Sequence, residues 1–139
     1  MLAPLRALRI SRPGHPLEVL ELVELPEPQP APGEALVEVL AAPISPMDRL
    51  AIRGLYPLPP PRGLPGAQGV GRVLEVHADG GQTPVKPGEL VLLPVRAGSW
   101  RERMSVPATE LLPLPANSDP VRRSTLRIEG LSASLLLEG

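Results

Sequence analysis

The chain has 139 residues, a formal net charge of −1 and no cysteine. This length supplies one hydrophobic core, so a complete two-domain enzyme is excluded. The absence of cysteine excludes disulfides, thiolate zinc sites and a cysteine nucleophile. Acidic and basic residues are interspersed and aromatic residues make up 1% of the chain, so a nucleic-acid-binding surface has neither the charge nor the stacking side chains it needs.

Hydrophobic residues make up 42% of the chain, beside 21 prolines and 13 glycines. The apolar content predicts a folded core, and so many turn-forming residues predict short elements rather than a long helical bundle. No stretch approaches the roughly 20 apolar residues of a membrane-spanning helix. We therefore expect a soluble, cytoplasmic protein that does not enter a membrane.

Short runs in which apolar and polar residues alternate recur along the chain, each bounded by a turn signal rich in proline, glycine or aspartate. These runs predict strands over residues 7–10, 17–25, 35–40, 70–77, 90–95, 101–106 and 111–114. Several short strands at this spacing are typical of a sandwich or barrel. The predicted fold class is therefore mainly β.

One segment between the strands carries the signals of a helix. Ser45 offers a capping hydroxyl, Pro46 fits the first helical position, and Asp48 lies three residues after the cap. Gly54 can end the helix. The pattern predicts a short helix over residues 46–53.

The C-terminal tail is also predicted to be helical. Asp119 and Pro120 form a second cap and first turn, and residues 121–137 contain no proline. We expect two helical pieces hinged near Gly130. Because residues 134–139 are strongly apolar and such a face needs cover, we expect the tail to fold back on the strands, to form a homodimer, or to mark a chain that has been cut.

Five motifs follow one another in a fixed order, over residues 32–39, 42–57, 66–73, 86–91 and 98–101. In this order they resemble the medium-chain dehydrogenase/reductase superfamily, and more closely its zinc-independent quinone oxidoreductase and 2-enoyl thioester reductase branch. The resemblance implies a GroES-like, partly open β-barrel over residues 1–119, of the catalytic type. It also implies that residues 120–139 are a helical segment leading toward a nucleotide-binding domain that this chain lacks.

The same resemblance bears on cofactors. Members of the branch bind NADPH or NADH in that second domain, through a glycine-rich turn between a strand and a helix. Gly66, Gly69 and Gly71 precede or interrupt a strand instead, so we expect no cofactor-binding residues here and no tight binding of the cofactor to residues 1–139. Zinc-dependent relatives have cysteine at the position of Ser45 and a His-Glu pair at residues 67–68, so no metal is expected.

Tyr56 is the residue that we expect to be catalytic. A phenol has an ordinary pKa of about 10, so it is protonated at neutral pH and can donate a proton to a carbanion or bind an enolate oxygen. In the thioester reductases that this chain resembles, the tyrosine at the matching position protonates Cα after hydride reaches Cβ. Arg53, three residues earlier, could favour the phenolate if it lies near. The alternative is that Tyr56 only packs against a proline-rich loop.

Other candidates have simpler structural explanations. Ser45 lies where the branch usually has an asparagine near the nicotinamide, but as a helix cap it already has a role, and the same holds for Asp48. Trp100 could line the acyl pocket or lie in the core. His15 flanks a predicted turn and His77 ends a predicted strand, so both are expected at the surface. Their separation along the chain suggests no metal site.

Residues 57–62 have the Pro-x-x-Pro-x-Arg form of a polyproline ligand, although a stiff loop shaping a pocket is the simpler interpretation.

Two functions follow. The first is the catalytic-domain portion of an NAD(P)H-dependent oxidoreductase that reduces an activated double bond, in an enoyl thioester or a quinone-like acceptor, with residues 1–139 alone inactive. The alternative is a stand-alone GroES-like binding or assembly module without enzymatic activity, in which an oligomer buries the leucines of the tail.

Overall fold

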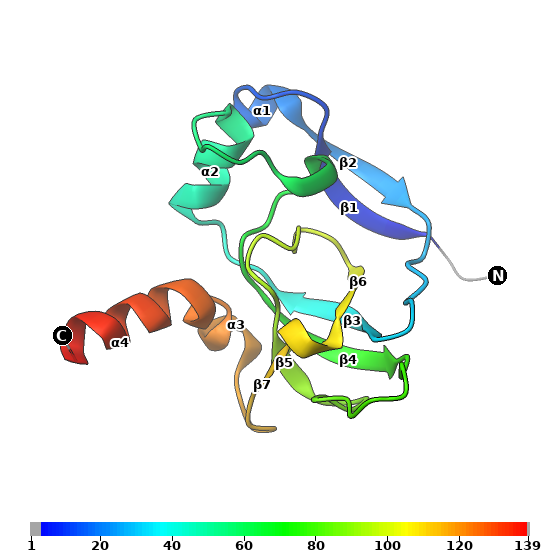
Figure 1. Cartoon of the computed structure of the whole chain (residues 1–139). Coiled ribbons are helices and arrows are strands. Elements are labelled where there is room, and N and C mark those ends of the chain that lie inside the picture. Colours follow the sequence, from blue (N-terminus) through cyan, green and yellow to red (C-terminus); the bar gives the residue numbers. More distant parts are fainter. Residues whose placement is uncertain (1–3, 139) are drawn as a thin grey trace.

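The computed structural model describes residues 4–138 and contains two antiparallel sheets (Figure 1). The strands are β1 (Leu5–Ile10), β2 (Leu20–Leu25), β3 (Glu34–Ala41), β4 (Val70–Val76), β5 (Leu90–Leu92), β6 (Arg103–Pro107) and β7 (Leu112–Pro113). The α-helices are α1 (Pro16–Val19), α2 (Pro46–Arg53), α3 (Pro120–Arg123) and α4 (Leu131–Glu138). β1 pairs with β2, and the larger sheet has the order β6-β3-β4-β5-β7. The prediction of a mainly β, partly open barrel is confirmed.

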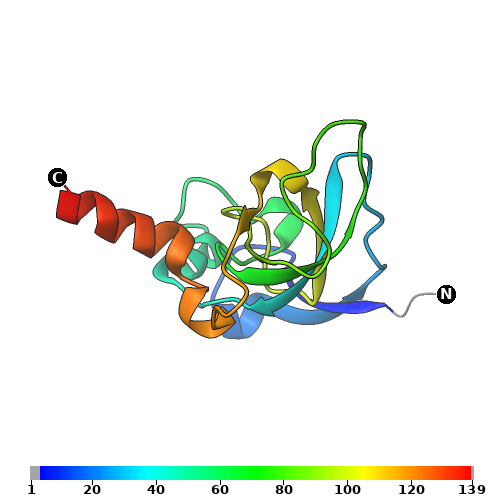
Figure 2. The ribbon, with the colours of Figure 1, turned by 90° about the horizontal axis from the view of Figure 1, so that it is seen from below.

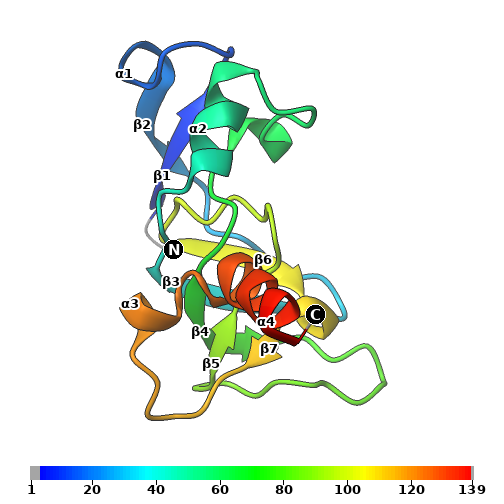
Figure 3. The ribbon, with the colours of Figure 1, turned by 90° about the vertical axis from the view of Figure 1, so that its left-hand side faces the viewer.

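The smaller sheet lies with α1 and α2 at one end of the molecule, and the larger sheet forms the other end (Figure 3). Ala7 of β1 joins the two ends through an isolated antiparallel bridge to Arg101. Beside it, the backbone amide of Arg6 donates to Glu102 at 2.7 Å and the Arg6 guanidinium donates to the same carboxylate at 2.8 and 3.0 Å. These hydrogen bonds, the backbone one first, hold the pKa of Glu102 below its ordinary value.

The core lies on the larger sheet, where buried and more exposed positions alternate along parts of β3, β4 and β6, while β5 is buried throughout. Its most deeply buried side chains are Ala35, Val37, Val73, Val91, Leu93 and Met104. A second cluster, formed by Ile10, Val19 and Ile52, packs α1 and α2 onto the smaller sheet. The apolar alternation that marks the strands therefore also marks the core.

One predicted strand begins later than expected. The prediction of a strand over residues 17–25 is wrong for its first part, because residues 16–19 form α1 and β2 starts at Leu20. Pro16 occupies the first helical turn, and the Nδ1 atom of His15 accepts a hydrogen bond from the amide of Leu17 at 3.3 Å. A cap and a proline outweigh alternation over so few residues. The other predicted strands are present, with ends shifted by up to three residues.

The tail is helical, but its break is not where the sequence predicts it. Asp119 caps α3, and the backbone leaves the helical region at Thr125 (φ −98°, ψ 2°). Gly130 is instead the last residue of a π-helical turn, Leu126–Gly130, and the chain continues from it into α4 without a break. α4 extends away from both sheets rather than folding back on them (Figure 2). No helix within residues 4–138 is long and apolar enough to span a bilayer.

Candidate functional site

α2 is tied to the glycine-containing loop before β4 by a buried carboxylate. The predicted capping box is present: Ser45 Oγ accepts from the amide of Asp48 at 3.3 Å, and Asp48 Oδ2 accepts from the Ser45 amide at 2.8 Å. Oδ2 also accepts from the Ser45 hydroxyl at 2.9 Å, while Oδ1 accepts from the amide of Ala67 at 2.8 Å. These bonds fix α2 against the loop before β4. The helix and the loop form the walls of a hollow.

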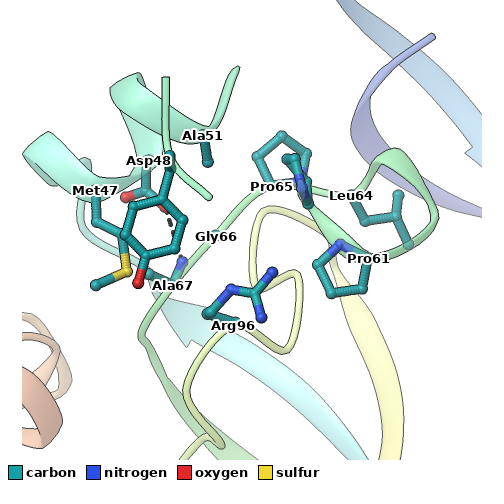
Figure 4. Close-up of a pocket in the computed structure, with 11 residues that line it drawn as sticks. Met47, Asp48, Ala51, Pro61, Leu64, Pro65, Gly66, Ala67 and Arg96 are labelled. Carbon is teal, nitrogen blue, oxygen red and sulfur yellow. Dashed lines mark hydrogen bonds between the residues drawn. The ribbon is translucent and has the colours of Figure 1, made fainter. Parts of the chain in front are cut away.

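This first hollow, which we call the narrow hollow, lies between α2 and the loop before β4 (Figure 4). Its volume is about 20 Å³, room for one water-sized centre. Its apolar lining includes Met47, Ala51, Pro61, Leu64 and Pro65. The hollow is also lined by Tyr56 and by two charged residues, Asp48 and Arg96. A small apolar group bearing one polar atom is the ligand chemistry that such a lining suits.

A second hollow, the broad groove, adjoins the first. Its volume is about 590 Å³, within the range of small-molecule sites. Arg12 and Arg62 supply its charge, and Tyr56, Ala51 and Pro60 line both hollows. Tyr56, half-buried, therefore stands where a narrow apolar space meets a wide basic one.

The proline-rich loop is not a free polyproline ligand. Residues 61–63 form a tight turn, and Arg62 adopts a left-handed conformation (φ 54°) that ends any polyproline helix. Pro59 accepts a hydrogen bond from the Arg96 guanidinium at 2.8 Å. The simpler interpretation, a stiff loop that shapes a pocket, is the one that the structure supports.

The cation near Tyr56 is not the one that sequence reasoning suggested. Arg53 lies on the exposed face of α2 beside Arg49, and it is not among the residues that line either hollow. Arg96 lines the narrow hollow instead, and its guanidinium points into the space between the labelled residues (Figure 4). Arg96 is the residue that the sequence analysis missed. Its position follows from a turn with φ 60° and from a bond between its amide and the carbonyl of Ala67, which no residue pattern marks.

The structure separates the other two candidates from Tyr56. Trp100 is half-buried against the cluster of Ile10, Val19 and Ile52, and its indole nitrogen donates to the carbonyl of Pro43 at 3.2 Å. It lines neither the narrow hollow nor the broad groove. Ser45 is 7% exposed, and its hydroxyl is engaged with Asp48. Both positions serve the packing around α2.

Gln68 connects the larger sheet to the tail. Its side chain is buried; the amide nitrogen donates to Glu129, and the carbonyl oxygen accepts from the backbone amide of Ile128 at 2.9 Å. The hydroxyl of Ser99 donates to the Gln68 backbone carbonyl. The position is thus part of the tail's attachment.

The arginines around the groove have few counter-charges. Arg101 donates to the carbonyls of Ala97 and Gly98 at 2.9 and 3.0 Å. Burial, and secondarily the charge of Arg62, lowers its pKa to about 10. In the described part of the chain no group of three or more acidic, histidine or cysteine side chains has the arrangement of a metal site. The local chemistry is therefore that of a basic cleft with one phenol.

Comparisons with known proteins agree with the resemblance. The model of the alcohol dehydrogenase GroES-like domain matches residues 31–116. The mitochondrial enoyl-[acyl-carrier-protein] reductase of Bos taurus is 35% identical over 137 residues, which is 95% of this chain and 35% of the relative. The chain spans well under half of the length of the curated relatives it matches.

Solved structures give the same result. The mitochondrial 2-enoyl thioester reductase heterodimer of Candida tropicalis is 25% identical with a TM-score of 0.83, over 98% of this chain and 43% of that one. A mutant of one of its subunits, also 25% identical, has been solved with NADP and crotonyl-CoA. A structure titled as a NADPH:quinone reductase of Bacillus thuringiensis is 26% identical with a TM-score of 0.82, over 96% of this chain and 40% of that one. The chain belongs to the alcohol dehydrogenase GroES-like domain family, within the medium-chain dehydrogenase/reductase superfamily.

Proposed function

We propose that this chain is the catalytic-domain portion of an NAD(P)H-dependent oxidoreductase that reduces the activated double bond of an enoyl thioester. The observation that carries the proposal is the position of Tyr56, which lines both the narrow hollow and the broad groove. In this proposal residues 1–119 form the catalytic-type domain, and residues 120–139 lead toward a nucleotide-binding domain in the full-length protein.

Tyr56 would supply the proton. Reduction of a C=C bond conjugated to a thioester adds hydride at Cβ and a proton at Cα, and a neutral phenol is able to give that proton. The narrow hollow has the apolar lining that suits the end of an acyl chain, and its volume of about 20 Å³ admits only the terminal, methyl-sized part of a short chain. Asp48 and Ser45 act as positioning residues, because they fix α2 against the loop that forms the opposite wall.

The cofactor is NADPH or NADH, and when bound it supplies the hydride. Residues 4–138 do not fit a dinucleotide by themselves: all named strand pairs in this range are antiparallel, and Gly69 and Gly71 lead into or lie in β4 rather than opening a helix. The NADP complex of the Candida tropicalis relative supports NADPH. The cofactor would therefore be held by residues beyond those described.

A quinone is the second candidate acceptor, since the relative from Bacillus thuringiensis is titled a quinone reductase. A homodimer is supported by the heterodimer of the Candida tropicalis reductase. A cytoplasmic location stays a prediction, because the curated reductases are named mitochondrial, and fractionation of the source cells tests it. Trp100 lines neither hollow, so its predicted role in lining the acyl pocket has no part in this proposal.

The test is acceptor-dependent oxidation of NADPH by the full-length gene product. Crotonyl-CoA should be turned over and a benzoquinone should be a poorer substrate by kcat/KM. Turnover of the quinone alone would replace the thioester with the second candidate, and turnover of neither would overturn the proposal. Residues 1–139 assayed alone should be inactive, since they lack the phosphate-binding turn.

A further inference from the structure

We propose that Arg12 and Arg62 bind the phosphate of the phosphopantetheine arm on which the acyl group is carried. This inference rests on the proposed function and assigns the substrate's carrier to the broad groove. Both arginines are among the residues that line the groove, and both are exposed. Within residues 4–138 neither forms an ion pair, and no carboxylate is among the residues that line the groove.

The position of Arg62 is built into the fold. Its backbone has φ 54°, a conformation that costs free energy in a residue with a Cβ atom and that persists where the surroundings impose it. The next residue, Gly63, lies so close to β1 that a Cβ atom there would be 2.3 Å from the carbonyl oxygen of Ile10. Arg62 is therefore held at the edge of the groove by a turn pressed against the smaller sheet.

Other arginines add to the positive charge around the broad groove. The half-buried guanidinium of Arg101 lies near enough to Arg62 for the two charges to repel, and Arg96 lines the adjoining hollow. Asp48 is the acidic residue in that lining, and its carboxylate already accepts hydrogen bonds from Ser45 and Ala67. An anion in the broad groove would therefore meet two arginines of its lining and no carboxylate among the residues that form that lining.

The broad groove also matches the phosphopantetheine arm in size, and it adjoins the narrow hollow at Tyr56. Coenzyme A and acyl carrier proteins present the acyl group on the same arm, an apolar thioester end separated by a flexible chain from a phosphate. A volume of about 590 Å³ can hold much of such an arm. Because Tyr56 lines both hollows, a thioester at Tyr56 can direct the end of its acyl chain toward the narrow hollow and leave its carrier in the groove.

A series of three substrates tests the inference in the full-length protein. They are the crotonyl thioesters of pantetheine, which has no phosphate, of 4′-phosphopantetheine and of coenzyme A. The variant is Arg12→Gln/Arg62→Gln, and the matched control is Arg49→Gln, an exposed arginine that lines neither hollow. The double variant should raise KM for both phosphorylated substrates by at least about tenfold with kcat unchanged, because binding lost equally in ground and transition states appears in KM. It should leave kcat/KM for crotonyl-pantetheine unchanged, and Arg62→Lys should recover part of the loss.

Equal effects on all three substrates, or none, would overturn the inference while leaving the proposed function intact. An effect confined to coenzyme A would place the contact on its nucleotide and overturn the assignment to the arm. Absence of turnover with every thioester would overturn the proposed function and the inference together. If the double variant does not fold, the wild-type protein decides: KM for crotonyl-phosphopantetheine should rise with ionic strength and KM for crotonyl-pantetheine should not.

Discussion

The carboxylate of Asp48 accepts a hydrogen bond from the backbone amide of Ala67 at 2.8 Å, across 19 positions of sequence. The same side chain completes the capping box of α2 with its other oxygen. One buried group, 3% exposed, thus caps the N-terminus of α2 and fixes the loop opposite to it. The narrow hollow between them depends on that bond.

Asp48→Ala is expected to lower the free energy of unfolding by about 3 kcal/mol, since it leaves buried donors on Ser45 and Ala67 unpaired. Ser45→Ala should cost about 1 kcal/mol, the usual cost of losing a cap. Urea unfolding of the chain measures both. Arg49→Gln, one residue from Asp48 but exposed, should change the value by less than about 0.5 kcal/mol. A loss of less than 1 kcal/mol for Asp48→Ala would contradict the conclusion that this carboxylate fixes α2 to the loop.

Gly66→Ala should be more destabilising than Gly80→Ala. Both glycines have positive φ, 116° and 95°, so both substitutions strain the backbone. A Cβ atom at Gly66 would be 2.4 Å from the nitrogen and the hydroxyl of Ser99, whereas at Gly80 nothing lies within 4 Å. We expect a difference of about 2 kcal/mol in the free energy of unfolding. Equal losses would mean that the loop beside the narrow hollow can move.

Tyr56→Phe should lower kcat for crotonyl-CoA about a hundredfold in the full-length protein, because general acid catalysis is lost. KM for NADPH should stay the same, since the proposed function assigns the cofactor to residues outside this loop. Leu58→Ala, an exposed residue of the same loop, is the control and should retain activity. An unchanged kcat in Tyr56→Phe would remove the phenol from the mechanism.

Gln68→Ala should loosen the tail without unfolding the sheets. The Ile128 amide donates to the Gln68 side chain, so its hydrogen exchange should become faster by about tenfold, while amides in β3 and β4 keep their protection. Gln82→Ala, at an exposed position, should leave both unchanged. Faster exchange throughout the sheets would instead show that Gln68 supports the whole core.

Glu102 should make stability depend on pH in the acid range. Its pKa in the folded state is lowered from the ordinary value of 4.5 by hydrogen bonds from Arg6, so its stabilising contribution is present above pH 4.5 and is lost as the pH falls through the folded-state pKa. Glu102→Gln should therefore flatten the pH dependence of the free energy of unfolding below pH 4.5. An identical dependence in the variant would mean that other carboxylates account for it.

Local signals in the sequence predicted the parts of this fold that are determined locally. The cap, proline and terminal glycine around α2 act within a few residues of one another, and the helix has the predicted bounds. Alternation alone does not predict where a strand begins: residues 17–19 alternate like a strand, but the His15 cap and Pro16 make them part of α1. The break in the tail was placed at Gly130 by its residue type, but it lies at Thr125, beside the segment that Gln68 holds. This contact joins positions 60 residues apart, so no local pattern in the sequence predicts it.

The candidate site shows the same division. Tyr56 could be selected because its chemistry is visible in one residue, and its neighbours in the motif are close in sequence. Arg96 could not, because it reaches the narrow hollow from a turn 40 positions away and is placed there by its backbone conformation. The charge near the phenol was therefore assigned to Arg53, the arginine nearest in sequence rather than in space.

The bonds of Ser45 and Gln68 have an evolutionary consequence. The resemblance places the metal-binding residues of zinc-dependent relatives at these two positions and at Ala67. Here the hydroxyl of Ser45 holds the start of α2, and the amide of Gln68 holds the tail. Cysteine at Ser45 would remove the capping hydroxyl, and glutamate at Gln68 would lose the donor to Glu129 and place a second carboxylate beside it, so acquiring a zinc-binding set by single steps would pass through destabilised intermediates.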